Sequence, residues 1–130
     1  MKITLRTNKN LQKELRFFID ENLNNLNSKL IENIKIASCE AIQNIQRHAY
    51  KNIDGMPIKI SLIIKDNILI LDIYDDAEPC NPKDFMKKEF IPSESGHMGL
   101  NIIKKITKSF EIFPKENGNH TQLIFSDLHI

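Results

Sequence analysis

A helical pattern that is apolar around much of its circumference constrains the fold of this chain more than any other feature. It covers residues 28–50, where an Asn-rich stretch ends and Ser28 can cap a helix that runs to about Tyr50. A helix this apolar must be largely buried, so the fold needs a second layer to cover it. Its few polar side chains then need an explanation of their own. The apolar positions are Leu30, Ile31, Ile34, Ile36, Ala37, Ala41, Ile42 and Ile45.

Short apolar runs elsewhere in the chain predict the strands of that second layer. Lys65-Asp66-Asn67 separates the second run from the third, and Asn117-Gly118, a strong hairpin-turn signal, lies between the fourth and the fifth. Both pairs of runs are therefore predicted to form β-hairpins. The predicted strands are residues 2–7, 58–64, 68–74, 110–113 and 121–125.

Two further helices and one long loop complete the prediction. A stripe of apolar residues at three- and four-residue steps predicts an amphipathic helix before the long one, and residues 98–108 predict a third helix. Residues 76–97 contain three prolines and no sustained apolar period, which indicates a loop. Loops of that length in compact domains are commonly functional. The stripe consists of Leu11, Leu15, Phe18, Ile19 and Leu23.

Together these elements predict one α+β domain over residues 1–130. A chain of 130 residues buries roughly two-thirds of the surface that it exposes when unfolded, which is enough for its own core. Apolar residues make up 41% and charged residues 27%, as in ordinary globular domains. Helices early in the chain and antiparallel strands later favour a two-layer sandwich, with helices on one face of a mixed, mainly antiparallel sheet.

The charge balance and the cysteines exclude several classes of function. The 18 basic and 17 acidic residues nearly cancel, so no overall field favours nucleic acid or an anionic membrane. The sequence shows no targeting segment and no apolar stretch long enough to cross a bilayer. Cys39 and Cys80 lack metal-type spacing and indicate free thiols. We therefore expect a soluble, cytoplasmic protein.

Four polar residues on the long helix could carry chemistry. Glu40 and Asn44 are four residues apart, and Arg47 or His48 follows after three or four more. At these spacings the side chains stack on one face of a helix. A carboxylate there could act as a base, and an amide oxygen suits a hard cation such as Mg²⁺. From spacing alone, an exposed polar stripe on the outer face of the helix is the favoured alternative.

Two more candidate elements flank the long loop. Asp75 falls where the strand 68–74 leaves the sheet, and a fixed carboxylate there can accept a hydrogen bond from an exocyclic amine. Taken alone, Asp75-Asp76 is more often a turn former. Gly96-His97-Met98-Gly99-Leu100 stands at the start of a helix, where glycines let backbone N–H groups approach a phosphate. As a lone motif, this segment is also compatible with an ordinary turn.

In this order and at these separations, the three elements resemble a known family. Ser38 to Tyr50 resembles the N box of the GHKL ATPase superfamily, and Glu-Ala-x-x-Asn-x-x-x-His-Ala-Tyr is similar to the form in anti-sigma-factor serine/threonine kinases. Leu71 to Pro82 resembles the Asp-x-Gly box of that family, and Gly96 to Leu100 resembles its short glycine box. Residues 118–123 are similar to its last strand. The resemblance covers nearly the whole chain and implies the histidine-kinase-like ATPase fold, also called the Bergerat fold.

The resemblance implies a site for ATP and Mg²⁺. Asn44 would ligate the magnesium ion, and Glu40 would be the general base toward a serine or threonine hydroxyl. Asp75 would bind the adenine amine, and Gly96 and Gly99 would supply backbone contacts to the phosphates. The further ATP contacts that the resemblance implies are Arg47, His48, Ala77, His97, Met98, Leu100 and Thr121.

The resemblance also implies protein partners. The enzyme would phosphorylate a STAS-type anti-anti-sigma protein and bind a sigma factor, and so regulate transcription by partner switching. A homodimer is a further implication. Neither nucleic acid nor a membrane is among the implied partners.

Two departures from the family pattern keep a second interpretation open. Ala77 stands where the family has glycine, and its Cβ could crowd the adenine. Pro79 stands in the second glycine position and has no N–H to donate. The alternative is a non-catalytic partner-switching adaptor of the same fold that binds ATP weakly or not at all.

Overall fold

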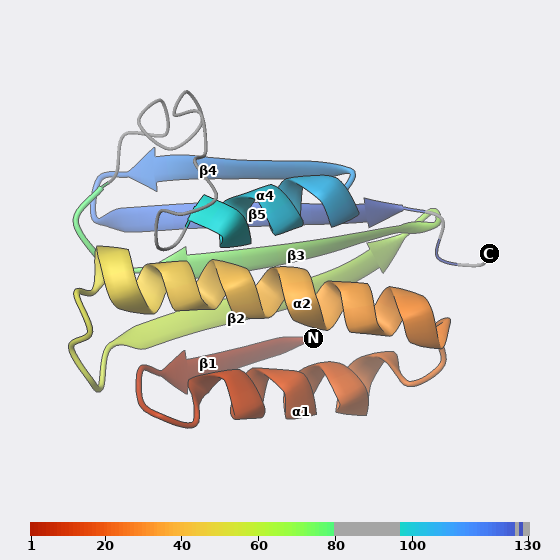
Figure 1. Cartoon of the computed structure of the whole chain (residues 1–130), viewed down its shortest axis with the longest axis horizontal. Coiled ribbons are helices and arrows are strands. Elements are labelled where there is room, and N and C mark those ends of the chain that lie inside the picture. The colour runs from red at the N-terminus through yellow and green to blue at the C-terminus, as the bar shows by residue number, and fades with distance from the viewer. Residues whose placement is uncertain (80–96, 127, 129–130) are drawn as a thin grey trace.

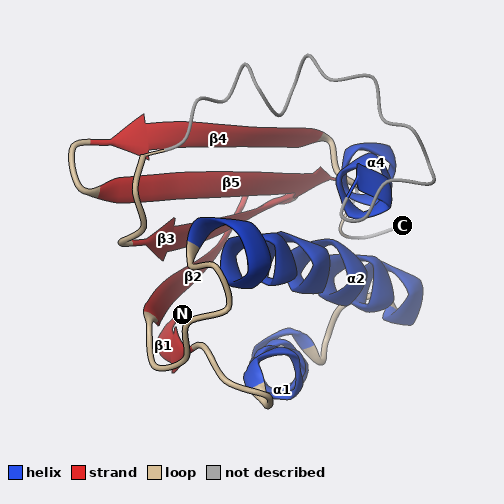
Figure 2. Cartoon of the chain, turned by 60° about the vertical axis from the view of Figure 1, so that its left-hand side comes forward, coloured by secondary structure: helices blue, strands red, loops and turns tan. Residues whose placement is uncertain are grey.

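The computed structural model describes residues 1–79, 97–126 and 128. In this part of the chain, three α-helices cover one face of a five-stranded sheet (Figure 1, Figure 2). The predicted α+β two-layer architecture is confirmed. The elements in chain order are β1 (Lys2–Arg6), α1 (Leu11–Leu23), α2 (Ser28–Asn44), the π-helical turn η1 (Ile45–Ala49), β2 (Pro57–Lys65), β3 (Ile68–Asp75), α4 (His97–Ile106), β4 (Ser109–Lys115) and β5 (Gly118–Ser126).

The sheet has the strand order β1-β2-β3-β5-β4, and every neighbouring pair is antiparallel. The sequence predicted a mixed, mainly antiparallel sheet. Among the described strands every neighbouring pair is antiparallel, so the sheet is antiparallel and not mixed. The reason lies in the second hairpin. β4 runs parallel to β3, but β5 lies between the two strands and is antiparallel to both.

The long helix is buried as its apolar pattern predicts. Ile34, Ala37 and Ile42 of α2 are fully buried, and the alternating Leu71 and Ile73 of β3 are buried in the same core. Burial of this kind supplies most of the stability of a helix in a protein. The core therefore fixes α2 across the sheet (Figure 1).

The cap of α2 differs from the prediction by one residue. The Asn27 side chain, not Ser28, accepts hydrogen bonds from the backbone N–H groups of Lys29, at 2.8 Å, and Leu30, at 3.3 Å. Both residue types are good N-caps. Asn27 has the extended backbone that a cap requires, whereas Ser28 is already the first helical residue.

The hairpin turns follow the sequence signals closely. Asp66 and Asn67 have φ values of 52° and 65°, as a two-residue type I′ turn requires. In the second hairpin, Lys115 pairs with Gly118, so the two turn residues are Glu116 and Asn117. This turn lies one residue before the predicted Asn117-Gly118.

The helix predicted to run to Tyr50 changes character at Asn44. Ile45–Ala49 forms a π turn, closed by a 2.8 Å hydrogen bond from the Tyr50 N–H to the Ile45 carbonyl. Lys51 and Asn52 then end the helix in the left-handed region, with φ values of 51° and 62°. The π turn was not predicted. Single π turns inside helices are rare and often lie at functional sites.

No helix in the described ranges is both long enough and apolar enough to cross a membrane. The predicted loop 76–97 falls mostly on residues 80–96, which lie outside the described residues.

Candidate functional site

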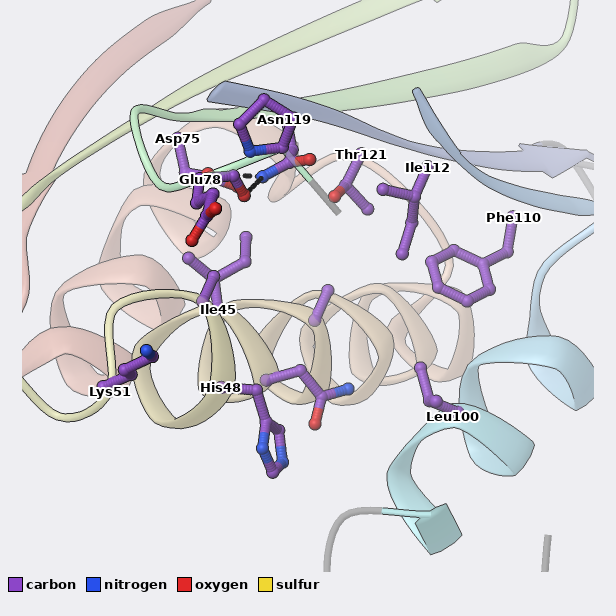
Figure 3. Close-up of a pocket in the computed structure, with 14 residues that line it drawn as sticks. Ile45, His48, Lys51, Asp75, Glu78, Leu100, Phe110, Ile112, Asn119 and Thr121 are labelled. Atoms are coloured by element: carbon purple, nitrogen blue, oxygen red, sulfur yellow. Dashed lines mark hydrogen bonds between the residues drawn. The ribbon is translucent and has the colours of Figure 1, made fainter. Parts of the chain in front are cut away.

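A pocket of about 200 Å³ lies between the end of α2, the start of α4 and the ends of β3 and β5 (Figure 3). Its sheet side carries polar groups at the strand ends, and its helix side carries an amide and two exposed polar side chains. The lining residues are Ala41, Asn44, Ile45, His48, Ala49, Lys51, Asp75, Glu78, Pro79, Leu100, Phe110, Ile112, Asn119 and Thr121.

Asp75 is the acidic group on the sheet side. It is the last residue of β3 and is only 4% exposed. Its Oδ1 accepts hydrogen bonds from the Ala77 N–H at 3.0 Å and from Asn119 Nδ2 at 3.1 Å. Burial raises the pKa of Asp75, and these two hydrogen bonds work in the opposite direction. The backbone N–H of Asn119 also donates to this carboxylate and likewise lowers its pKa.

Asn119 and Gly118 fasten the start of β5 to this strand end. Asn119 Nδ2 also donates to the Glu78 carbonyl at 3.2 Å (Figure 3). Gly118 has a φ of +125°, and a Cβ at this position would lie 2.0 Å from the Asp75 carbonyl oxygen. Only glycine allows this approach and this backbone conformation. The start of β5 therefore contacts both the side-chain carboxylate and the backbone carbonyl of Asp75.

Tyr50 joins the end of the π turn to the same strand end. Its hydroxyl donates to the Pro57 carbonyl at 2.6 Å and accepts from the Asp76 N–H at 2.7 Å. The residue is 3% exposed, and burial raises the pKa of the phenol. The hydroxyl therefore stays protonated at neutral pH and can make both bonds.

The helix side of the pocket has a polar group without a partner. Asn44 is the last α-helical residue before the π turn, and its buried Nδ2 has no hydrogen-bond acceptor among the described residues. Unpaired buried polar atoms are few in native structures, and each one calls for an explanation. His48 and Lys51 are exposed and line the pocket farther along the chain.

Five of the residues selected from the sequence line this pocket together. They come from α2, η1, β3, α4 and β5, so the fold brings together segments more than 70 residues apart along the chain. These residues are Asn44, His48, Asp75, Leu100 and Thr121.

Three other selected residues do not line it. Glu40 lies one helical turn before Asn44 and is half-buried, whereas Arg47 is exposed on η1. Ala77 is buried, has no positive φ, and uses its N–H to hold Asp75. Its backbone conformation is therefore one that does not require glycine.

The glycine segment is only partly described. His97, Met98 and Gly99 have their backbone in the first turn of α4, and Gly96 lies outside the described residues.

Sequence reasoning missed Asn119 and Lys51, which line the pocket, and Tyr50, which does not line it but accepts a hydrogen bond from the Asp76 N–H. Asn119 could have been found, because residues two apart in a strand share a face and Thr121 was already a candidate. Lys51 offered no such signal, and the contacts of Tyr50, the last residue of the 40–50 pattern, depend on the unpredicted π turn.

Within the described ranges, no group of three His, Cys, Asp or Glu side chains could hold a metal ion.

The sequence matches a family model described as the histidine kinase-like ATPase domain, over residues 5–125. A search of curated protein sequences finds no significant match.

Solved structures share the fold at low sequence identity. The RsbU and RsbW domains of Rv1364c from Mycobacterium tuberculosis give a TM-score of 0.68 at 17% identity, over 97% of this chain and 31% of that chain. The catalytic domain of histidine kinase ThkA gives 0.61 at 18% identity, over 95% of each chain. The Acinetobacter baumannii histidine kinase AdeS gives 0.57 at 18% identity, over 77% of this chain and 48% of that chain. This chain thus spans about a third of the first structure and about half of the third, and the likeness is one of fold.

Proposed function

We propose that this chain, which belongs to the histidine kinase-like ATPase domain family, binds Mg²⁺-ATP in the pocket between α2 and the ends of β3 and β5. ATP is the ligand that membership of this family implies. The observation that carries the proposal is the buried, unpaired amide nitrogen of Asn44 at the pocket wall. Such a group lowers stability until a ligand pairs with it.

The sheet side of the pocket fits a purine base. Asp75 Oδ1 is held by two donors, and a carboxylate has about four lone-pair sites, so it can also accept a hydrogen bond from an exocyclic amine. Phe110 and Ile112 of β4, together with Ile45 of η1, offer apolar surface to a flat ring. We therefore assign the base to this side of the pocket.

The helix side fits the phosphates. The amide of Asn44 can turn its nitrogen toward a phosphate oxygen or its oxygen toward Mg²⁺. Lys51 and His48 add polar side chains at the exposed rim, and the first-turn N–H groups of α4 suit an anion. Bound Mg²⁺ would neutralise phosphate charge.

We further propose that the chain is a serine/threonine kinase of the anti-sigma-factor type. Glu40 would take the proton of a partner's serine or threonine hydroxyl at a carboxylate oxygen, as the hydroxyl oxygen bonds to the γ-phosphorus and ADP leaves. Its place one turn before Asn44, on the same helix face, supports this role.

The partners are a STAS-type anti-anti-sigma protein as substrate and a sigma factor as the bound target. Two observations support this choice: the Glu-Ala-x-x-Asn-x-x-x-His-Ala-Tyr pattern of residues 40–50, and a fold shared with a structure that contains an RsbW domain.

Thermal unfolding with and without Mg²⁺-ATP tests the binding proposal. A ligand at about 100 times its dissociation constant adds roughly 2.7 kcal/mol, a shift of several degrees for a domain of this size. We expect a magnesium-dependent shift that Asn44→Ala abolishes. A wild-type protein whose midpoint does not move at millimolar ATP would overturn the proposal.

Phosphorylation of a STAS protein tests the kinase proposal separately. Glu40→Gln should bind Mg²⁺-ATP as the wild type does and lose phosphoryl transfer. Unchanged transfer in this variant would remove Glu40 from the role of base.

One observation favours the adaptor as a second candidate. Pro79 lines the pocket and has no N–H to offer a nucleotide. An adaptor would bind its partners equally well with and without ATP, so a partner affinity that changes strongly with ATP would reject it. The buried Ala77 does not line the pocket and gives the adaptor less support than the sequence indicated.

A further inference from the structure

Tyr50 makes contacts that the proposed chemistry does not use. Its hydroxyl lies between two backbone groups far apart in the sequence, the Pro57 carbonyl at the start of β2 and the Asp76 N–H just after β3. Asp76 directly follows the carboxylate that we assign to the base. The hydroxyl therefore ties the end of the long helix to the strand end that carries Asp75.

The π turn places Tyr50 at this position. Its N–H bonds to the Ile45 carbonyl five residues earlier, whereas a regular α-helix would use the residue four earlier. Each residue of an α-helix turns the chain by about 100°. Without the extra residue in this turn, the Tyr50 ring would leave helix α2 in another direction and would not reach Asp76.

The Tyr50 contact completes a set of restraints on Asp75. Asp75 Oδ1 is fixed by the Ala77 N–H and by Asn119 Nδ2. The N–H of the preceding residue, Asp76, donates to the Tyr50 hydroxyl. Tyr50 therefore holds the segment that also carries the Ala77 N–H. Loss of the Tyr50 bond would free this segment to move and would let the carboxylate turn. The carboxylate would then no longer be fixed in the direction in which it meets the exocyclic amine.

We propose that Tyr50 is a positioning residue that sets base selectivity: its hydroxyl holds the 75–77 segment so that the Asp75 carboxylate recognises an exocyclic amine. This inference rests on the proposed nucleotide site and adds to it the group that determines which base is accepted. Tyr50 itself does not line the pocket.

The test compares two nucleotides on one variant. Tyr50→Phe removes only the hydroxyl. Isothermal titration gives dissociation constants for Mg²⁺-ATP and for the triphosphate of purine riboside, which lacks the exocyclic amine. In the wild type we expect ATP to bind about tenfold more tightly, because the analogue leaves a buried acceptor unpaired. In Tyr50→Phe the affinity for ATP should fall about tenfold and that for the analogue should stay unchanged.

The ratio of the two constants is the readout, because it is insensitive to stability. If part of the variant is unfolded, both apparent affinities fall by the same factor. Equal losses for both nucleotides therefore indicate a merely structural role and overturn the inference, as does a variant that keeps the ratio of the wild type. A wild type that binds neither nucleotide would instead overturn the proposed function.

Tyr74→Phe is the matched control. Tyr74 is 40% exposed, stacks on His120 at a ring-centroid distance of 4.4 Å, and does not line the pocket. The same chemical change there should leave the ratio as in the wild type. Asp75→Asn alone should abolish the preference for ATP over the analogue. The double variant Asp75→Asn/Tyr50→Phe should then have the same ratio of dissociation constants as Asp75→Asn.

Discussion

The polar groups on the two sides of the pocket differ in whether they have hydrogen-bond partners. On the sheet side, Asp75 Oδ1, Asn119 Nδ2 and the Tyr50 hydroxyl each take part in two hydrogen bonds. On the helix side, the buried Asn44 Nδ2 has no partner among the described residues. The sheet side is thus organised without a ligand, whereas on the helix side the proposed ligand would supply the missing partner of Asn44.

This difference has an energetic meaning. A buried polar group without a partner costs about 1–3 kcal/mol, and proteins commonly accept such losses where function requires them. Substitutions on the sheet side should therefore reduce stability, and substitutions on the helix side should reduce binding while stability is kept. The predictions below test that contrast, beginning with the largest expected effect.

Gly118→Ala should be the most damaging change on the sheet side. The new Cβ would overlap the Asp75 carbonyl, and the φ of +125° is strained for any residue with a side chain. We expect a loss of about 3 kcal/mol or more in the free energy of unfolding, measured with urea. Gly55→Ala is the control: φ is +84° there and nothing lies within 4 Å of the new Cβ, so the loss should be about 1 kcal/mol. Equal losses would show that the strand ends are not tightly packed.

Asn44→Ala should have the opposite effect on the free protein. It removes an unpaired buried group, so the free energy of unfolding without ligand should stay the same or rise by up to about 1 kcal/mol. Asn33→Ala, on the same helix but outside the pocket, is the control and should retain the stabilisation by Mg²⁺-ATP. A marked loss of stability in Asn44→Ala would place Asn44 in the structural network and break the contrast.

Asp75→Asn should change how stability depends on pH. Burial raises the pKa of Asp75 in the folded state, so the stability that this group contributes is fully present below its unfolded pKa and is lost as pH rises through the folded pKa. Asparagine keeps the acceptor Oδ1 and has no charge to bury. Urea unfolding between pH 4 and pH 7 should show the variant gaining stability relative to the wild type as pH rises. A difference that shrinks with pH would contradict the assigned direction.

Lys51→Ala should have the smallest effect. Lys51 is exposed at the rim of the pocket, and exposed charge pairs contribute about 0.2–1 kcal/mol. We expect ATP affinity to fall by up to about fivefold at low salt and by less at high salt, with adenosine affinity unchanged. Lys65→Ala, at the turn between β2 and β3, is the control. A loss of adenosine affinity would mean that Lys51 acts on the base side.

The sequence predicted those parts of the molecule that burial alone decides. Leu11 to Leu23 repeats at helical spacing and forms α1 with the same limits, and the two apolar runs around Asp66-Asn67 form the first hairpin. Asn44 was noticed as a polar residue on an apolar helix and Asp75 as an acidic residue at a strand end, and the resemblance to a known family gave each a role. Their presence in one pocket is a property of the fold.

What the sequence did not predict depends on hydrogen-bond partners. Asn27 and Ser28 are equally suitable caps by residue type, and only the backbone conformation decides between them. The composition of residues 45–49 gives no sign of the π turn. The turn changes the direction in which the following side chains leave the helix, and the apolar period of so short a segment does not reveal this change. Tyr50 therefore looked like the end of a helix, although it is the link to Asp76.

The π turn η1 also determines which changes in chain length the protein can accept. Its hydrogen bond encloses one residue more than an α turn does, so deletion of a single residue from Ile45–Ala49 could produce an unbroken α-helix with good local geometry. That deletion would nevertheless rotate Tyr50 away from Pro57 and Asp76. A substitution at the exposed Arg47 leaves the spacing intact. The end of the long helix thus constrains the number of residues more strongly than their identity, and related sequences should vary there by replacement and not by insertion or deletion.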